Sequence, residues 1–152
     1  MHSRSLRTIY TRAICGFFCL IALACGIIAG RVSWVWFAPV AGSCFVAFGQ
    51  PESRMARKRN VIGGHVCAFA VGGLTRWLVL DQGIAIVAAT CITFALMLLL
   101  DCLHSPAGAT PAGVCLSSST LPEVAAVLSI GLGMTVLMQF ILARATARTE
   151  TP

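Results

Sequence analysis

The sequence predicts an all-α fold, a polytopic bundle of transmembrane helices with five to six membrane segments. Of its 152 residues, 58% are hydrophobic and only 11% are charged, and the mean hydropathy is +0.89. A soluble domain carries about 25% charged residues. The few charged residues also gather between apolar runs, several of which approach the roughly 20 residues that cross a bilayer. These observations exclude an ordinary soluble domain.

Five apolar runs and one weaker run predict the elements in order. The N-terminal run follows arginines, as in a signal peptide, but it continues to Gly30 and we expect it to be retained as a span. The second run is short and contains Pro39, which predicts a weak or broken helix. The predicted runs cover residues 13–30, 34–49, 61–80, 83–100 and 121–143, with residues 106–119 as the weaker run.

Basic residues decide between five and six crossings, because positive residues in short loops favour the cytoplasm. They form three clusters, before the first run, between the second and third, and after the last. All three share one side only if residues 106–119 also cross, so six crossings are favoured and five remain an alternative. The clusters are Arg4, Arg7 and Arg12, then Arg54, Arg57, Lys58 and Arg59, then Arg144 and Arg148, while Arg31 and Arg76 lie outside.

This topology divides the chain into three parts. We expect a cytoplasmic N-terminal tail at residues 1–12, a membrane domain at residues 13–143 and a cytoplasmic C-terminal tail at residues 144–152. The membrane is expected to be the cell membrane, either a bacterial inner membrane or a plasma membrane. Trp34, Trp36 and Trp77 are then expected at the outer interface, which favours indole rings.

Residues 38–43 and 105–110 resemble each other. Each stretch has a proline, then small residues, then a hydroxyl side chain. With three crossings per unit, the two halves would have opposite orientations, which is the inverted repeat common in secondary transporters. The alternative is a chance match, because small residues are frequent in membrane helices.

Several blocks of the sequence resemble the HPP family of integral membrane proteins, over residues 15–143. The most specific are Asn60-Val61-Ile62-Gly63-Gly64-His65 and Pro106-Ala107-Gly108-Ala109-Thr110. Further matching blocks are residues 42–44, 48–51 and 95–100. The family is named for a His-Pro-Pro tripeptide, and this chain has Ser105 at the middle position. The resemblance implies about four spans and a transporter, because some plant and cyanobacterial members are associated with nitrite transport.

The broken segments are where we expect a substrate site near the bilayer centre. Backbone that leaves the helix at membrane depth must be buried in protein or face a wet cavity, and broken helices hold the substrate in transporters. Helices that begin just after Pro39 and Pro106 would direct free N–H groups at an anion. Glycines would let the anion approach the backbone, and hydroxyls would donate to it. The alternative is that the hydroxyls only cap their own helices.

Two histidines, His65 and His104, lie close to the predicted spans. An ionisable residue within the membrane is a functional candidate, and imidazole exchanges a proton near neutral pH. The alternative is that each ring is satisfied by a nearby carbonyl. The expected substrate-binding residues are Gly42, Ser43, His65, His104, Gly108 and Thr110.

The loop before the third span and the end of the fourth are also informative. Residues 54–59 are expected to fix the topology and to touch anionic headgroups, or alternatively to draw anions toward a vestibule. Asn60 is expected to cap the third span. Asp101 is expected to end the fourth span at the cytoplasmic face.

No cofactor and no metal are predicted. Asp101, Cys102 and His104 are too close in sequence to supply a full tetrahedral site. No nucleophile–base pair and no phosphate-binding loop stands out, so we expect no enzyme. A copper site would be an alternative only if four cysteines converged, and their spacing does not favour it. These cysteines are Cys44, Cys67, Cys102 and Cys115.

Two functions are therefore weighed. The first is a small transporter or channel for an inorganic anion such as nitrite, and a proton link is an open alternative. Its expected partners are the bilayer and the anion; a homo-oligomer is left open, and nucleic acid is not expected. The second is a non-transporting scaffold or accessory subunit. A polar pocket between the two breaks favours transport, whereas side chains that close this space favour the scaffold.

Overall fold

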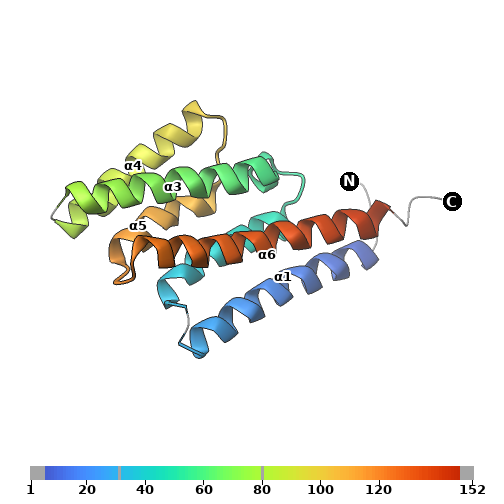
Figure 1. The fold of residues 1–152 in the computed structure, drawn as a ribbon. Helices are drawn as coiled ribbons and strands as arrows, with labels where there is room; N and C mark the ends of the chain where they lie inside the picture. Colours follow the sequence, from blue (N-terminus) through green and yellow to red (C-terminus); the bar gives the residue numbers. More distant parts are fainter. Residues whose placement is uncertain (1–5, 31, 80, 148–152) are drawn as a thin grey trace.

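A computed structural model describes residues 6–30, 32–79 and 81–147, and over these ranges the protein is a bundle of helices without strands (Figure 1). The predicted fold class is confirmed. The helices are α1 (Leu6–Ile28), α2 (Phe37–Cys44), α3 (Lys58–Leu78), α4 (Gln82–Leu99), α5 (Thr110–Leu116) and α6 (Leu121–Ala147). Short turns are the 3₁₀ helices η1 (Trp34–Trp36), η3 (Arg54–Ala56) and η4 (Ser105–Ala109), and the π-helical turn η2 (Phe45–Gly49). Arg4, Arg31, Leu80 and Arg148, which entered the sequence predictions, lie outside the described residues.

Four helices, α1, α3, α4 and α6, are long and apolar enough to cross a membrane. They match the four long predicted runs to within three residues, except that α1 begins at Leu6, before the predicted start at residue 13, and α6 ends at Ala147, beyond the predicted end at residue 143. Two shorter stretches lie between them. We call residues 34–49 the first broken segment and residues 105–116 the second broken segment; they comprise η1, α2 and η2, and η4 and α5.

One end of the bundle, which we call the basic end, carries the charged loop between η2 and α3. Arg12 near the start of α1 lies 3.4 Å from Glu52, and Arg54 lies 2.7 Å from Asp101 after α4. Gln139 near the end of α6 donates to the carbonyl of Ala56. The start of α1, the end of α4 and the last part of α6 therefore all contact the charged loop at the basic end.

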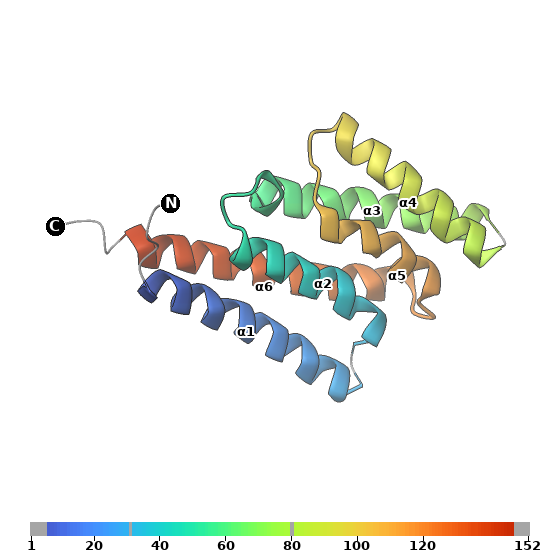
Figure 2. The ribbon, with the colours of Figure 1, turned by 180° about the vertical axis from the view of Figure 1, so that it is seen from behind.

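At the opposite end, polar side chains hold the second broken segment. Arg76 in the last turn of α3 donates to the carbonyls of Val114 and Ser119. Gln82 at the start of α4 donates to the carbonyl of Cys115. The two broken segments are shorter than the four long helices and lie beside them inside the bundle, as Figures 1 and 2 show, so six crossings stay a prediction.

The bundle places small residues inside and large apolar residues outside. Ala68, Ala89 and Ala107 are fully buried, whereas Phe17 and Leu99 are 65% and 83% exposed. Close contact of small residues is how membrane helices associate when lipid is as apolar as their side chains. The exposed apolar surface is therefore the surface that faces lipid.

The three tryptophans differ in exposure. Trp34 and Trp77 are exposed, but Trp36 is buried. Its ring lies where a side chain at Gly113 would be, 2.9 Å from the position of a Cβ atom there. Trp36 is therefore part of the packing between η1 and α5 and is not exposed as the other two tryptophans are.

Candidate functional site

The two broken segments bring four polar side chains into one buried cluster. Ser43 comes from α2, His65 from α3, His104 from the loop before η4, and Thr110 from the start of α5. Each of them is at most 1% exposed. We call these four residues the His–Ser cluster. All four were expected site residues, so the sequence identified which polar groups meet.

Ser43 is the centre of the His–Ser cluster. Its Oγ lies 2.9 Å from His65 Nε2 and 3.0 Å from His104 Nε2. It is also 2.7 Å from the carbonyl oxygen of Pro39, one helical turn earlier. On the far side of His65, Nδ1 lies 2.8 Å from Thr110 Oγ1.

The carbonyl of Met55 fixes the direction of this hydrogen-bond chain. It lies 2.8 Å from His104 Nδ1, and because a carbonyl only accepts, Nδ1 must carry hydrogen. A neutral His104 then has a bare Nε2, which accepts from the Ser43 hydroxyl only when the single hydrogen of that hydroxyl turns away from the Pro39 carbonyl, 2.7 Å away. His65 Nε2–H in turn donates to Ser43 Oγ, and Thr110 donates to His65 Nδ1. In this neutral state every ring nitrogen has a partner.

A second complete state differs by one proton. When His104 is doubly protonated, its Nε2–H donates to Ser43, and the Ser43 hydroxyl donates to the Pro39 carbonyl instead. Only hydrogen positions change between the two states. The His–Ser cluster can therefore accept one proton without leaving a buried polar group unpaired, which would otherwise cost about 1–3 kcal/mol.

Glycines explain how the elements approach so closely. A Cβ atom at Gly64 would lie 2.9 Å from the Cβ of His104, and one at Gly63 would lie 3.1 Å from the Cβ of Cys102. A Cβ atom at Gly42 would lie 3.0 Å from the Cβ of Pro106. In contrast, a Cβ atom at Gly108 would meet nothing within 4 Å. Gly42 is thus a packing residue between the two broken segments, whereas Gly108 leaves space.

The predicted helix starts differ from the observed ones. Gly42 and Ser43 lie in the last turn of α2, far from its start at Phe37. Gly108 lies in a 3₁₀ turn, and α5 begins only at Thr110. The expected pair of facing helix starts was therefore wrong. The capping alternative was wrong too, because neither hydroxyl caps its helix: Ser43 and Thr110 bond to imidazoles.

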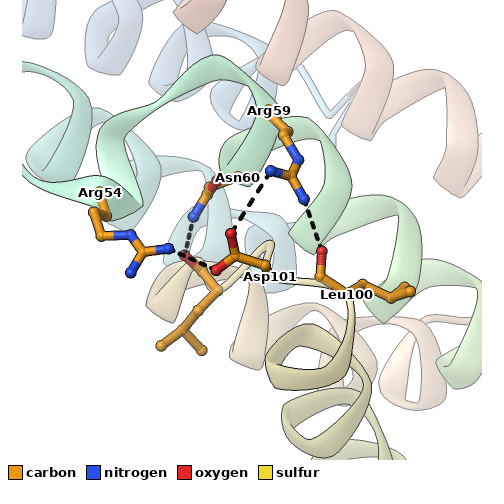
Figure 3. Close-up of polar contacts among 6 residues, drawn as sticks. Arg54, Arg59, Asn60, Leu100 and Asp101 are labelled. Carbon is orange, nitrogen blue, oxygen red and sulfur yellow. Dashed lines mark hydrogen bonds and ion pairs between the residues drawn. The ribbon is translucent and has the colours of Figure 1, made fainter.

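Polar contacts at the basic end hold the residues that lead from α4 to His104, and Figure 3 shows those made by Leu100 and Asp101. Asp101 has φ 50° and ends α4, with the N–H of Cys102 donating to the Met97 carbonyl as in a Schellman motif. The Asp101 carboxylate lies 2.7 Å from Arg54 and 3.7 Å from Arg59. The predicted end of the fourth span at Asp101 is confirmed.

Asn60 has a role other than the predicted one. Arg57 occupies the cap position of α3, and Asn60 lies inside the helix. Its amide donates to the carbonyl of Leu103, 3.0 Å away and next to His104 (Figure 3). Asn60 therefore positions the histidine loop, a contact between distant parts of the chain that no local sequence signal predicts.

The His–Ser cluster lies nearer the basic end than expected. His65 is the eighth residue of α3, roughly 10 Å along a helix of about 30 Å. Two apolar cavities, of about 450 Å³ and 260 Å³, lie beside α1, and none of the four cluster residues lines either. Side chains close the space between the two breaks, which is the arrangement that the scaffold alternative predicts.

The four cysteines of the copper alternative do not converge. Cys67 and Cys102 have their sulfur atoms 4.0 Å apart. Cys44 lies next to Thr135, and Cys115 lies next to the carbonyl of Gly72. Among the described residues, no group of three metal-ligating side chains meets.

Sequence reasoning missed the two carbonyls that complete the cluster. The Pro39 carbonyl had a signal, because serine often bonds to the carbonyl four residues earlier in a helix. The Met55 carbonyl had none, since it comes from η3 on a loop that only tertiary contacts place.

Comparisons with known proteins match the sequence to a family of membrane proteins. The model of the family described as HPP, transmembrane region, matches residues 2–152. A transmembrane protein of Dictyostelium discoideum is 34% identical over 74 residues, which is 46% of this chain. The match spans only 26% of that relative's length. No solved structure matches the chain.

Proposed function

Because the chain belongs to the HPP family of transmembrane proteins, we propose that it carries a small inorganic anion such as nitrite across the cell membrane, with the His–Ser cluster as its site. The observation that carries this proposal is the meeting of Ser43, His65, His104 and Thr110 where two helices are broken. Buried ionisable residues within a membrane are costly and are found where ions or protons move. The proposal is transport without enzymatic chemistry.

The two protonation states of the cluster support a proton link. A protonated His104 adds one positive charge inside the bundle, and a small anion would neutralise it. Anion and proton would then move together, so that uptake should increase when the side from which the anion enters is acidified. The hydroxyls of Ser43 and Thr110 and the ring N–H groups are the donors that the anion would use.

Movement of the second broken segment would open the site. The segment contacts the first one through Pro106 against Gly42, and its start is held by Asn60 and Asp101 at the basic end. Gly108 leaves open space in the same segment. A homo-oligomer belongs to the same proposal, because one protomer of this size offers little room for a path.

The second candidate function is a non-transporting scaffold. The observation that favours it is the close packing between the breaks, where all four cluster residues are at most 1% exposed. In that case the His–Ser cluster only fixes the packing of α2, α3 and α5, as a fully satisfied buried network can do.

Uptake of nitrite into proteoliposomes tests the proposal. Wild type is compared with His104→Ala, Thr110→Val and the control Thr93→Val, at two external pH values and against empty vesicles. Thr93 is equally buried, but its hydroxyl has no hydrogen-bond partner among the residues that the structure describes. We expect uptake above empty vesicles in wild type and Thr93→Val, faster at the lower pH, and its loss in the other two variants. Wild-type uptake equal to that of empty vesicles would favour the scaffold.

A further inference from the structure

An apolar groove runs along α1 on the side of the first broken segment. It has a volume of about 450 Å³. Ala13, Gly16 and Leu20 on α1 form one wall, and Phe45 and Phe48 in η2 form the other. Phe45 is 69% exposed, so the groove opens on the lipid-facing surface of the bundle. We call it the α1 groove.

The α1 groove has the length of one leaflet. Its lining residues on α1 extend from Ile9 to Leu20, which is about 16 Å along the helix axis. The hydrocarbon core of a bilayer is about 30 Å thick. A groove of this length, open to lipid and starting at the basic end, matches the depth of one acyl chain.

Arg12 lies at the basic end of the α1 groove and also lines it. Its side chain is only 18% exposed, and its Nε is buried with no hydrogen-bond partner among the described residues. The contact of its Nη2 with Glu52 is long, at 3.4 Å. A buried charged donor without a partner is costly. A phosphate oxygen would satisfy it, because guanidinium groups pair well with phosphate.

The charge of the basic end points to the same ligand class. The described side chains there include more basic than acidic groups, and such a surface attracts the anionic lipids of a cytoplasmic leaflet. The basic residues are Arg12, Arg54, Arg57, Lys58, Arg59 and Arg144, and the acidic residues are Glu52 and Asp101.

We propose that the α1 groove binds one anionic phospholipid, with an acyl chain along the groove and its phosphate on Arg12. This proposal does not depend on the transport activity. Cys44, the neighbour of Ser43, is part of the groove wall. A lipid in the groove therefore contacts the same turn of α2 that carries the centre of the His–Ser cluster.

Native mass spectrometry of the full chain tests this proposal. The protein is extracted from vesicles of equal phosphatidylglycerol and phosphatidylcholine that have the same oleoyl chains. We expect one retained lipid, with the anionic headgroup preferred about fivefold, since one basic residue near an anionic surface contributes about that factor. The preference should be lost in Arg12→Gln, be reduced in Arg12→Lys and remain in Arg57→Gln, which removes an exposed charge at the same end.

A second pair of variants tests the groove itself. Ala13→Phe should reduce retention of both lipids, whereas Ala22→Phe, in the other apolar cavity beside α1, should leave the anionic lipid in place. Melting curves verify that each variant is folded, and Gly16→Leu replaces Ala13→Phe if that variant is not. Equal retention of both lipids by wild type would overturn the proposal. An equal loss of the anionic-lipid preference in Arg12→Gln and Arg57→Gln would also overturn it. So would recovery of the wild-type protein as a dimer without bound lipid, because a second copy of the chain would then cover the groove.

Discussion

The two broken segments share a sequence pattern but differ in backbone and in packing. Each places one hydroxyl on His65, Ser43 on one ring nitrogen and Thr110 on the other. In the first segment the hydroxyl lies inside continuous helix, whereas in the second it lies at the junction of η4 and α5. The shared pattern therefore determines which groups meet at His65, and it does not determine the local backbone.

The prolines account for part of this difference. Pro39 lies in the first turn of α2, where its missing N–H costs nothing and the helix continues past Ser43. The second segment has two prolines, Pro106 near the start of η4 and Pro111 near the start of α5. Because proline disfavours α-helix at the preceding residue, the second proline favours a new start at this point. The second segment is therefore the one with a break beside the cluster.

Loss of the Ser43 hydroxyl should have the largest effect, because this hydroxyl contacts both imidazoles of the His–Ser cluster. Ser43→Ala leaves two buried ring nitrogens without a partner, whereas Thr110→Val leaves one. Each unpaired group costs about 1–3 kcal/mol. The melting temperature in detergent should therefore fall more for Ser43→Ala than for Thr110→Val. Thr93→Val is the control, and its melting temperature should not fall, since the Thr93 hydroxyl has no partner among the described residues. Equal falls in melting temperature for Ser43→Ala and Thr110→Val would contradict the central role of Ser43.

The glycines of the two segments provide the next comparison. Gly42→Ala puts a methyl group 3.0 Å from the Cβ of Pro106, and the proline ring cannot move aside. Overpacking of this kind costs about 1–3 kcal/mol. Gly108→Ala meets open space and should leave the melting temperature unchanged or raise it slightly, because alanine loses less backbone entropy than glycine. Equal falls in melting temperature for Gly42→Ala and Gly108→Ala would mean that the second segment is packed as tightly as the first.

The two histidines of the His–Ser cluster should differ in tautomer, because the Ser43 hydroxyl of the first segment bonds to a ring nitrogen of each. Near neutral pH, the neutral His104 should carry hydrogen on Nδ1, opposite the Met55 carbonyl, and His65 on Nε2, facing Ser43. Nitrogen NMR of histidine-labelled protein distinguishes the tautomers. On acidification, His104 should gain hydrogen on Nε2 while the His65 Nε2–H remains. Hydrogen on Nε2 of a neutral His104 would contradict the direction of the chain.

The sequence predicted the features that depend on local composition, and it did not predict the contacts that depend on tertiary packing. Apolar runs predicted the all-α bundle and its four long helices, because membrane thickness sets the length of each apolar run. The two broken segments predicted Ser43 and Thr110, and the position of ionisable side chains close to the spans predicted His65 and His104. Contacts made through tertiary packing were not predictable, such as the donation from Asn60 to the Leu103 carbonyl, because nothing near these residues in sequence specifies them.

The smallest effect is expected where this chain departs from the family tripeptide. Ser105 is exposed, and His104 before it has φ −138° and ψ 99°, close to the extended region that precedes proline. Ser105→Pro should therefore change stability by no more than about 0.5 kcal/mol, and both tautomers should persist. A large fall in melting temperature would show that η4 needs the backbone N–H of Ser105, which proline lacks. Because the second segment already tolerates prolines in both of its short helices, a third at its first residue tests whether its backbone is set by proline or by the contacts of His104.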